Sequence, residues 1–376
     1  ARSSRAISSP APRANCASAQ NDKLGNEATT KMIFRELNHG KCKTYIAISE
    51  ASRKAVVIDP LRDKVERYLA ALAYHGWRLV LIIDTHTHAD HRSGAMELGA
   101  LADAPVAMHV LAPAPHVTIH VEDGQVLKVG DEELRVLHTP GHTPDSISIV
   151  AKDRVFTGDV LFIHGTGRAD FAGGDAGIQY DSITRKLFTL PDETLVFPAH
   201  DYRGHTQSTI LDEKRTNPRL AGKTRDDYIN LMNNLGLPLP DGIQESLQPN
   251  ESDLDPGTIK FPTLSQLNQV RQLSAAELRD RLASAKPPML IDVREEDEYR
   301  GELGHIAGAR LIPLKELPER SAELANAKGC DIVAICRAGV RSATAAAILT
   351  GLGFEHVWNL KTGMLEWNAA QLPIER

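Results

Sequence analysis

Residues 79–91 read LVLIIDTHTHADH, an apolar run followed directly by a cluster of metal-ligating side chains. The run from Leu79 to Ile83 is typical of a buried strand, because it is short, aliphatic and free of polar residues. Four potential ligands come where that strand should end and a loop should begin: His86, His88, Asp90 and His91. Three imidazoles and one carboxylate in a single short turn predict a metal centre at the rim of a sheet.

Three further candidate ligands follow segments that have the pattern of a strand. They are His142, Asp159 and His200, and the segments before them are 134–137, 154–156 and 194–197. Small or turn-forming residues separate each strand from its ligand. Because loops at one rim of a layered sheet can converge, we expect all of these side chains to gather at one site.

These seven residues, in this order, resemble the signature of the metallo-β-lactamase superfamily, H-x-H-x-D-H followed by a separate His, Asp and His. Within that superfamily the chain is most similar to the glutathione persulfide dioxygenases, through the segments 165–171, 198–202 and 213–220. The resemblance covers residues 32–245. It implies an αββα metallo-β-lactamase sandwich for this part of the chain.

The resemblance also implies the metal. Hydrolases of the superfamily use the seven residues for two metals, whereas the dioxygenases hold one iron, and the number of ligands in the sequence does not separate these cases. The dioxygenase pattern makes His86, His142 and Asp159 the ligands of one Fe(II), with coordination positions left for substrate and O₂. The other motif residues would then orient ligands and substrate without touching iron: His88, Asp90, His91 and His200.

Glutathione carries two carboxylates, so a site for it should offer fixed cationic and hydrogen-bonding groups. Arg168, Tyr202 and Arg215 lie in segments that resemble the glutathione-binding region of the dioxygenases. We therefore expect these three side chains to bind the substrate.

The length of 376 residues predicts two or three domains. A polar stretch without periodicity at 246–263 indicates a linker between a first domain at 32–245 and a second at 264–376. Residues 1–31 are rich in Ser, Ala and Arg, with no acidic residue before Asp22, which is typical of a disordered or targeting segment. An upstream extension fits equally well, because Met32 could be a native start.

The second half of the chain alternates between helix and strand patterns. A capping box at 274–277 opens a helix, and the apolar segment 289–293 follows as a strand, as in a parallel sheet covered by helices. A later strand, 332–335, runs into Cys336 and then into a helix predicted to begin at Ser342. Loop amides, the helix dipole and two arginines, Arg337 and Arg341, favour an anion there, so we expect Cys336 to be a reactive thiolate.

This half resembles single-domain rhodaneses in four segments: 292–294, 304–309, 336–341 and 363–367. Related phosphatases have five residues between Cys and Arg, whereas four lie between Cys336 and Arg341, which favours sulfur transfer over phosphate chemistry. Lys361 and Thr362 precede Gly363 where rhodaneses commonly show two glycines. The resemblance implies a rhodanese-like α/β domain with a parallel sheet.

Together the two resemblances imply a persulfide dioxygenase joined to a rhodanese. The first domain would convert glutathione persulfide, O₂ and water into glutathione and sulfite. The second would exchange sulfane sulfur between thiosulfate and glutathione, with sulfite and glutathione persulfide on the other side of the reaction. Each domain would therefore supply a substrate of the other, and concentrations would decide the direction of net flux.

Two alternatives stay open at this point. A glyoxalase II-like thioester hydrolase with two metals, fused to a sulfurtransferase, would also take a glutathione-derived substrate, although segments 167–171 and 217–220 favour the dioxygenase. A non-catalytic sulfur carrier or persulfide sensor would need Cys336 but not the complete set of metal ligands.

Composition limits the class of protein further. The net charge of −6 argues against nucleic-acid and anionic-membrane partners, and no apolar run approaches the about 18 residues of a membrane span. Four cysteines without framework spacing, one of them a required thiolate, predict a reducing compartment. We expect a bacterial cytoplasm, with the mitochondrial matrix as the alternative, and the oligomeric state stays open, a homo-oligomer included.

Overall fold

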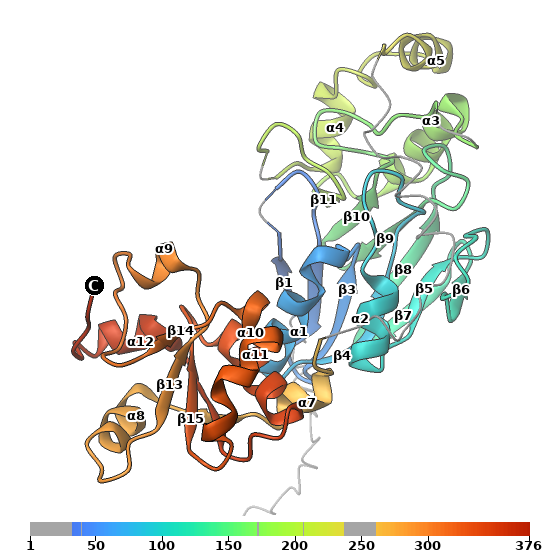
Figure 1. Cartoon of the computed structure of the whole chain (residues 1–376). Helices are drawn as coiled ribbons and strands as arrows, with labels where there is room; N and C mark the ends of the chain where they lie inside the picture. Colours follow the sequence, from blue (N-terminus) through green and yellow to red (C-terminus); the bar gives the residue numbers. More distant parts are fainter. Residues whose placement is uncertain (1–31, 39, 171–172, 206, 237–260) are drawn as a thin grey trace, which may run out of the picture.

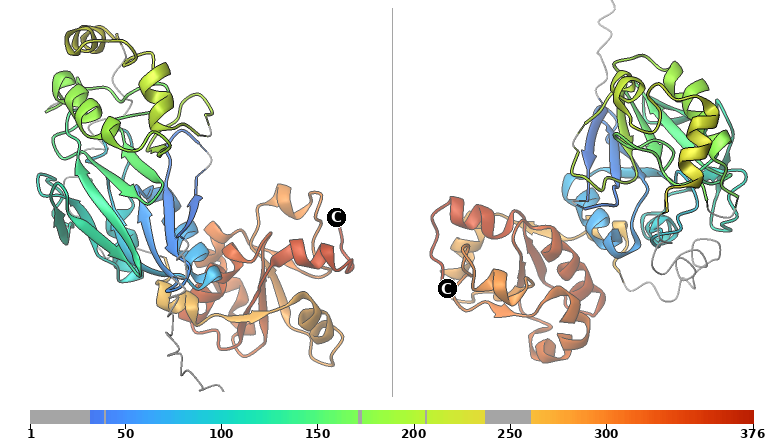
Figure 2. Two further views of the ribbon diagram at one scale, coloured as in Figure 1. Left: turned by 180° about the vertical axis from the view of Figure 1, so that it is seen from behind. Right: turned by 90° about the horizontal axis from the view of Figure 1, so that it is seen from above.

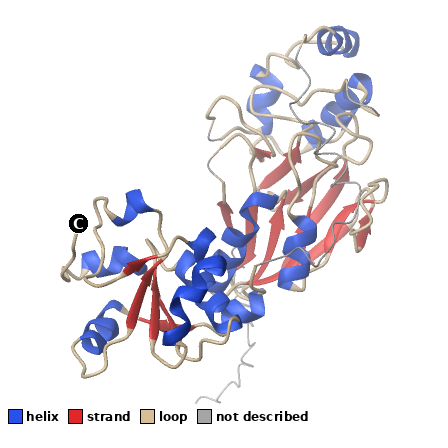
Figure 3. Ribbon diagram, in the orientation of Figure 1, coloured by secondary structure: helices blue, strands red, loops and turns tan. Residues whose placement is uncertain are grey.

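The computed structural model describes residues 32–38, 40–170, 173–205, 207–236 and 261–376 (Figure 1). The predicted segment 1–31 and most of the predicted linker lie outside the described residues. Two sheets with their helices form the first domain, and a third sheet with its helices forms the second (Figure 3). The predicted fold class, a two-sheet sandwich followed by a domain with a parallel sheet, is confirmed.

The first sheet has the strand order β1-β2-β3-β4-β5-β6. Its strands are β1 (Met32–Glu36), β2 (Tyr45–Ser49), β3 (Lys54–Ile58), β4 (Arg78–Ile83), β5 (Val106–His109) and β6 (Ile119–Val121). β1, β2 and β3 pair antiparallel, whereas β3 through β6 pair parallel. The strand predicted at 79–83 is β4, in the middle of this sheet.

The second sheet has the order β11-β10-β9-β8-β7. Its strands are β7 (Val126–Val129), β8 (Glu132–His138), β9 (Ile147–Ala151), β10 (Arg154–Gly158) and β11 (Leu195–Pro198). All neighbours are antiparallel except β10 and β11. The three predicted strands before His142, Asp159 and His200 are therefore confirmed as β8, β10 and β11.

The two sheets pack face to face with helices on their outer faces. Leu81 and Ile83 of β4 lie in the same buried cluster as Val136 and Phe156 of the second sheet. Ile82 lies in a different cluster, with residues of α1 (Val65–His75) and α2 (Ala95–Ala102). Since β4 is covered on both faces, its apolar run is uninterrupted. The outer face of the second sheet packs against α3 (Ala176–Arg185), α4 (Ile210–Thr216) and α5 (Arg225–Asn233).

The third sheet is parallel throughout, with the order β12-β16-β15-β13-β14. Its strands are β12 (Arg271–Leu273), β13 (Met289–Asp292), β14 (Arg310–Leu311), β15 (Ile332–Ile335) and β16 (Val357–Leu360). The helices of this part are α7 (Leu264–Asn268), α8 (Ala275–Leu282), α9 (Glu296–Tyr299), α10 (Leu317–Arg320), α11 (Val340–Gly351) and α12 (Gly363–Ala369). Short 3₁₀ turns lie at Arg62–Lys64, Leu187–Thr189, Leu314–Glu316 and Ser321–Ala327.

Local sequence signals mark the starts of some helices. Ser274 closes the predicted capping box at the start of α8, and Thr224 closes another at the start of α5. The predicted start at Ser342 was wrong, because α11 begins at Val340. Gly339, with φ of 86°, turns the chain directly into the helix, and a side chain there would overlap the carbonyl oxygen of Lys361. None of the helices in the described ranges is long and apolar enough to cross a membrane.

An apolar joint connects the two domains. Ala347 of α11 and Leu264 and Leu267 of α7 belong to the same buried cluster as Leu69 and Leu72 of α1. The views in Figures 1 and 2 agree that α7 and α11 lie beside α1. The two domains therefore share buried surface rather than being held by the chain connection alone.

A buried ion pair holds the second domain together beside β13. Arg294 donates to Asp292 Oδ2 at 2.7 Å and to the carbonyl oxygens of Glu298 and Gly304 at 3.0 and 2.8 Å. Arg294 is 1% exposed and Asp292 is fully buried. The guanidinium therefore ties the end of β13 to the loop that precedes β14.

We predict that Arg294→Met lowers the free energy of unfolding of the second domain by about 3–5 kcal/mol, because Asp292 stays buried without its partner. Urea denaturation, followed by the fluorescence of the tryptophans, measures the change. The control is Arg300→Met, whose pair with Glu296 is largely exposed and should matter by less than about 0.5 kcal/mol. Equal effects of the two substitutions would contradict the buried-pair argument.

Candidate metal centre

The strand ends bring three of the predicted ligands together as expected. His86 follows β4, His142 follows β8 and Asp159 directly follows β10. One ligand atom from each of the three lies within 4.8 Å of the others, and all three side chains are buried. We call these residues the His86 triad.

Two buried aspartates position the chain on either side of His86. Asp59, at the end of β3, accepts hydrogen bonds from the backbone N–H and the hydroxyl of Thr85 at 2.7 and 3.0 Å. Asp145, just before β9, accepts from the N–H and hydroxyl of Thr87 at 2.9 and 2.7 Å. Asp59 directly follows a strand of the first sheet and Asp145 precedes a strand of the second, so the ligand loop is anchored to both layers of the sandwich.

The ring orientations in the triad suit a metal. The Nδ1 atom of His142 donates to the carbonyl oxygen of Arg168 at 2.7 Å, and Nδ1 of His86 contacts the hydroxyl of Thr85 at 2.9 Å. Both Nε2 atoms therefore face Asp159 Oδ2, at 4.0 Å from His86 and 3.8 Å from His142. No hydrogen-bond partner of His86 Nε2 is found among the described residues, although the atom is buried.

Charges in the triad also match a metal site. Burial, together with the neighbouring His88, holds the pKa of His86 well below its usual range, so this imidazole is neutral. Burial alone would raise the pKa of Asp159, but His200 and His86 lower it below the usual range. Neutral imidazole and ionised carboxylate are the forms that bind metals. Two imidazoles and one carboxylate fit the facial arrangement of non-haem iron(II).

A close backbone contact between Gly167 and Asp159 supports the triad. Gly167 lies against the carbonyl oxygen of Asp159, where a Cβ atom would overlap that oxygen and stand 3.2 Å from His142 Nδ1. Gln179 donates to the carbonyl oxygen of Gly167 at 3.1 Å, and its own side-chain oxygen accepts from Tyr228 at 2.9 Å. The sequence did not single out these supporting residues, because their roles arise from tertiary contacts.

His88 lies in a second group, with two carboxylates. Its Nε2 atom is 3.5 Å from Asp59 and 3.8 Å from Asp84, and all three side chains are buried. Burial alone would lower the pKa of His88, but the two aspartates raise it well above the usual range. A cationic imidazole held by two carboxylates is not free to coordinate a metal in this arrangement.

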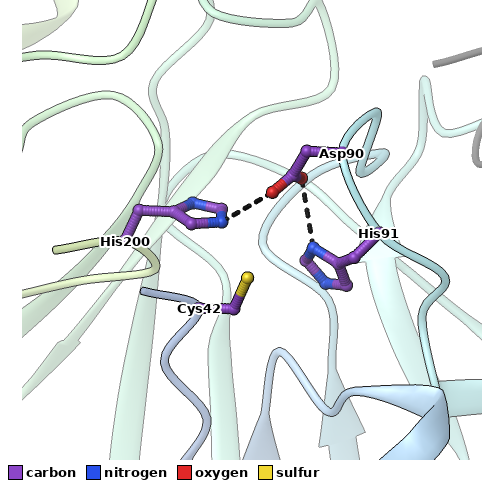
Figure 4. A group of neighbouring side chains, drawn as sticks. All are labelled: Cys42, Asp90, His91 and His200. Carbon is purple, nitrogen blue, oxygen red and sulfur yellow. Dashed lines mark hydrogen bonds and ion pairs between the residues drawn. The ribbon is translucent and has the colours of Figure 1, made fainter. Parts of the chain in front are cut away.

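The remaining motif residues form a third group, which also contains a cysteine that sequence analysis missed. His200 contacts Asp159 Oδ1 through Nδ1 at 2.7 Å and Asp90 Oδ2 through Nε2 at 2.8 Å. His91 Nδ1 contacts Asp90 Oδ1 at 3.1 Å. Cys42 lies beside them (Figure 4). Burial alone would raise the pKa of its thiol, but hydrogen bonds from His200 and His91 lower it to about 6.

The predicted glutathione-binding residues have different surroundings. Tyr202 stacks on His200, with ring centroids 5.6 Å apart, and is 59% exposed, so it lies at the mouth of the centre. The Arg168 guanidinium pairs with Asp170 at 2.6 Å. Arg215 is exposed in the last turn of α4, and in the described parts of the chain no recorded contact joins it to the ligand groups. Substrate binding by these residues stays a prediction.

The predicted sulfur nucleophile lies in the second domain at the start of α11. Cys336 is 1% exposed, and its Sγ atom accepts from the N–H of Gly339 at 3.1 Å and from the hydroxyl of Ser342 at 3.2 Å. Gly363, with φ of 58°, packs so closely on the carbonyl oxygen of Cys336 that a side chain would overlap it. Where rhodaneses commonly show two glycines, the single Gly363 is therefore the residue that allows this close backbone contact.

The two predicted arginines of the cysteine loop differ. Arg341 forms two contacts of 2.7 Å with the carboxylate of Glu298, a partner that the sequence did not reveal. Arg337 is exposed at the mouth of the loop. Their roles in anion binding stay predictions.

Comparison with known proteins places both domains. Residues 40–200 match the family model described as "Metallo-beta-lactamase superfamily", and residues 274–370 match "Rhodanese-like domain". "Persulfide dioxygenase ETHE1, mitochondrial" of Homo sapiens is 37% identical over 209 residues, which cover 55% of this chain and 82% of that protein. The crystal structure of ETHE1 from Myxococcus xanthus is 46% identical with a TM-score of 0.57, covering 58% of this chain and 98% of that one.

A metallo-beta-lactamase structure from Staphylococcus aureus shares the fold over a longer part of the chain. It covers 88% of this chain and 99% of its own, with a TM-score of 0.55 and 22% sequence identity.

We predict that Gly167→Ala reduces metal affinity of the first domain by roughly 10–100-fold, because the added methyl group must displace the backbone of Asp159 and the ring of His142. Metal content per chain after equilibrium dialysis measures the loss. Gly165→Ala is the matched control, since a Cβ there would meet only Phe162, at 3.8 Å. If the two variants retain metal equally, the Gly167 contact does not support the triad.

Proposed function

Because the chain belongs to the persulfide dioxygenase family and carries a rhodanese-like domain, we propose that it oxidises glutathione persulfide with O₂ to sulfite and glutathione at a mononuclear iron(II). The observation that carries this proposal is that the seven motif residues fall into separate groups. His86, His142 and Asp159 face one another, whereas His88 is engaged by two aspartates. This partition supports a three-residue iron site.

Iron(II), when bound by the triad, would supply the redox chemistry with O₂, and such triads keep coordination positions open. The side chains of the protein prepare that chemistry. His86, His142 and Asp159 would hold the iron, and the Asp159 carboxylate would supply one negative charge. His200 holds a proton between Asp159 and Asp90 and so keeps the Asp159 carboxylate oriented.

Exposed side chains near the triad would position the substrate. Tyr202 offers an exposed aromatic face beside His200. We propose that Tyr202, Arg168 and Arg215 bind glutathione, with the guanidinium groups pairing with its carboxylates. Arg168 would then exchange Asp170 for the substrate, while its carbonyl oxygen continues to orient His142.

For the second domain we propose transfer of sulfane sulfur by Cys336. The thiolate attacks the sulfane sulfur of thiosulfate, the S–S bond of thiosulfate breaks and sulfite leaves. A glutathione thiolate then takes the sulfur from the cysteine persulfide, which gives glutathione persulfide and regenerates Cys336. The N–H of Gly339 and the hydroxyl of Ser342 stabilise the negative sulfur, and Arg337 and Arg341 favour the anionic substrate.

Fusion of the two activities raises the local concentration of their shared compounds, glutathione persulfide and sulfite. The net direction between thiosulfate and sulfite follows from their concentrations. Because the mechanism needs a reduced Cys336, we propose a reducing compartment, the bacterial cytoplasm first and the mitochondrial matrix second.

One observation favours a second candidate function. Asp90, His91 and His200 gather beside the triad, as a glyoxalase II-like thioester hydrolase with two metals would require. The two functions differ in their need for O₂, so a direct assay separates them.

We predict that the purified protein consumes O₂ on addition of glutathione persulfide, in proportion to its bound iron, and that sulfite is formed in equal amount when Cys336→Ser prevents the second domain from consuming it. An oxygen electrode and a sulfite assay measure both quantities, and metal analysis gives the iron content. Hydrolysis of lactoylglutathione serves as the control reaction. Thioester hydrolysis without O₂ uptake would identify the hydrolase instead.

We predict that Cys336→Ser abolishes sulfur transfer from thiosulfate to glutathione, because serine does not form a persulfide, while the initial rate of O₂ uptake on addition of glutathione persulfide is unchanged. Sulfite release and O₂ uptake are measured on the same preparation. Cys330→Ser, at an exposed position, is the matched control and should change neither activity. Loss of both activities in a folded Cys336→Ser protein would contradict two independent sites.

A further inference from the structure

We propose that Asn359 is a positioning residue for sulfur transfer at Cys336, because its side chain holds Gly339 in the orientation that points the Gly339 N–H at the cysteine sulfur. The inference rests on the proposed sulfur transfer and adds to it a residue from outside the cysteine loop. Asn359 lies in β16, next to the strand β15 that leads into Cys336. Its Nδ2 atom donates to the carbonyl oxygen of Gly339 at 3.0 Å.

Gly339 is the point at which the loop backbone meets the sulfur, and it needs a restraint from outside. Its N–H donates to Cys336 Sγ at 3.1 Å, and its φ of 86° lies in the left-handed region. Because glycine adopts many backbone conformations at little cost, its own preferences do not fix the direction of this N–H. The hydrogen bond from the N–H of Ala343 to the Gly339 carbonyl oxygen is long, at 3.3 Å. The shorter bond from Asn359 is therefore the stronger restraint.

The end of β16 contacts Gly339 at a second point. The carbonyl oxygen of Lys361 lies so close to Gly339 that a Cβ atom there would overlap it. A side chain and a backbone carbonyl group of the same short segment, 359–361, thus both contact Gly339. The first contact orients the glycine, and the second limits its position.

Gln272 of β12 fixes the amide group of Asn359 in turn. The two residues are partners in the register of β12 and β16. Asn359 Nδ2 donates to Gln272 Oε1 at 2.8 Å, in addition to its bond with Gly339. A side-chain NH₂ group has two hydrogens, so each of the two acceptors takes one of them. Rotation of the amide would therefore break a hydrogen bond.

The burial of Asn359 argues against a role in packing alone. The residue is 1% exposed, and its Oδ1 atom has no hydrogen-bond partner among the residues that the structure describes. A buried oxygen without a partner destabilises the fold, and an apolar side chain of the same size would avoid that loss. The bond that the amide donates to Gly339 explains its presence better than stability does.

The N–H of Gly339 matters in the first half of the proposed sulfur transfer. The Cys336 thiolate attacks the sulfane sulfur of thiosulfate, the S–S bond of thiosulfate breaks, and sulfite leaves with the bonding electrons. A directed N–H stabilises negative charge on the cysteine sulfur without having to reorganise during the step. Loss of the Asn359 restraint should therefore slow this step and leave the binding of thiosulfate unchanged.

Asn359→Leu tests the inference, because leucine has a similar size and no donor. In a single turnover of the full-length chain with thiosulfate, we expect sulfite release about tenfold slower than in the wild type, with an unchanged half-saturating thiosulfate concentration. Asn368→Leu is the matched control. Asn368 of α12 also donates to backbone carbonyl oxygens, those of Leu303 and Met364, which lie outside the cysteine loop. Sulfite release at the same rate in the two variants would overturn the proposal.

Gln272→Leu keeps the test decisive if Asn359→Leu does not fold, because Gln272 is exposed. This variant leaves Asn359 in place but frees its amide group to rotate. We expect sulfite release to slow by about threefold. A wild-type rate in Gln272→Leu would count against the proposed positioning.

Hydrogen exchange of the Gly339 N–H separates a failure of this inference from a failure of sulfur transfer, because it needs no turnover. Faster exchange in Asn359→Leu than in Asn368→Leu, in a protein whose wild type releases no sulfite from thiosulfate, supports the positioning of Gly339 and rejects the sulfur transfer. Unchanged exchange and a wild-type rate of sulfite release in Asn359→Leu support the sulfur transfer and reject the positioning.

Discussion

The metal centre depends on one constraint, the anchoring of residues 85–87 by two buried aspartates. Asp59 in the first sheet holds Thr85, and Asp145 beside the second sheet holds Thr87. A buried carboxylate needs donors around it, and a buried loop needs acceptors for its N–H groups, so each satisfies the other. His86 lies between the two anchored threonines, and its backbone is therefore fixed with respect to both layers of the sandwich.

The same anchoring divides the histidines of the motif among different partners. Asp59 not only holds Thr85 but also lies 3.5 Å from His88, which it draws into a group with Asp84. His86 instead contacts the hydroxyl of Thr85 and faces the carboxylate of Asp159. His200 joins the triad to the group of Cys42, because its two ring nitrogens contact Asp159 and Asp90. Histidines that are close in the chain thus have different partners, and the pKa of His86 is lowered whereas that of His88 is raised.

The cysteine loop of the second domain also depends on close contacts between two backbone segments. Gly339 and Gly363 allow the cysteine loop and the segment before α12 to approach each other, so that the N–H of Met364 donates to the carbonyl oxygen of Cys336 at 2.9 Å. The joint through α1, α7 and α11 then packs this domain on the first one. The two domains are therefore packed together by buried apolar surface.

The sequence by itself predicted the strands that precede the candidate site residues, the capping box of α8, the candidate ligands and the cysteine loop, because apolar periodicity, capping boxes and motif spacing are local signals. Only the tertiary structure decided how these residues are grouped. The pairing of His88 with Asp59, the place of Cys42 beside His200, and the pairing of Arg341 with Glu298 all join segments that are distant in the chain. Such contacts depend on how sheets and loops pack, and a single sequence carries no local pattern for them.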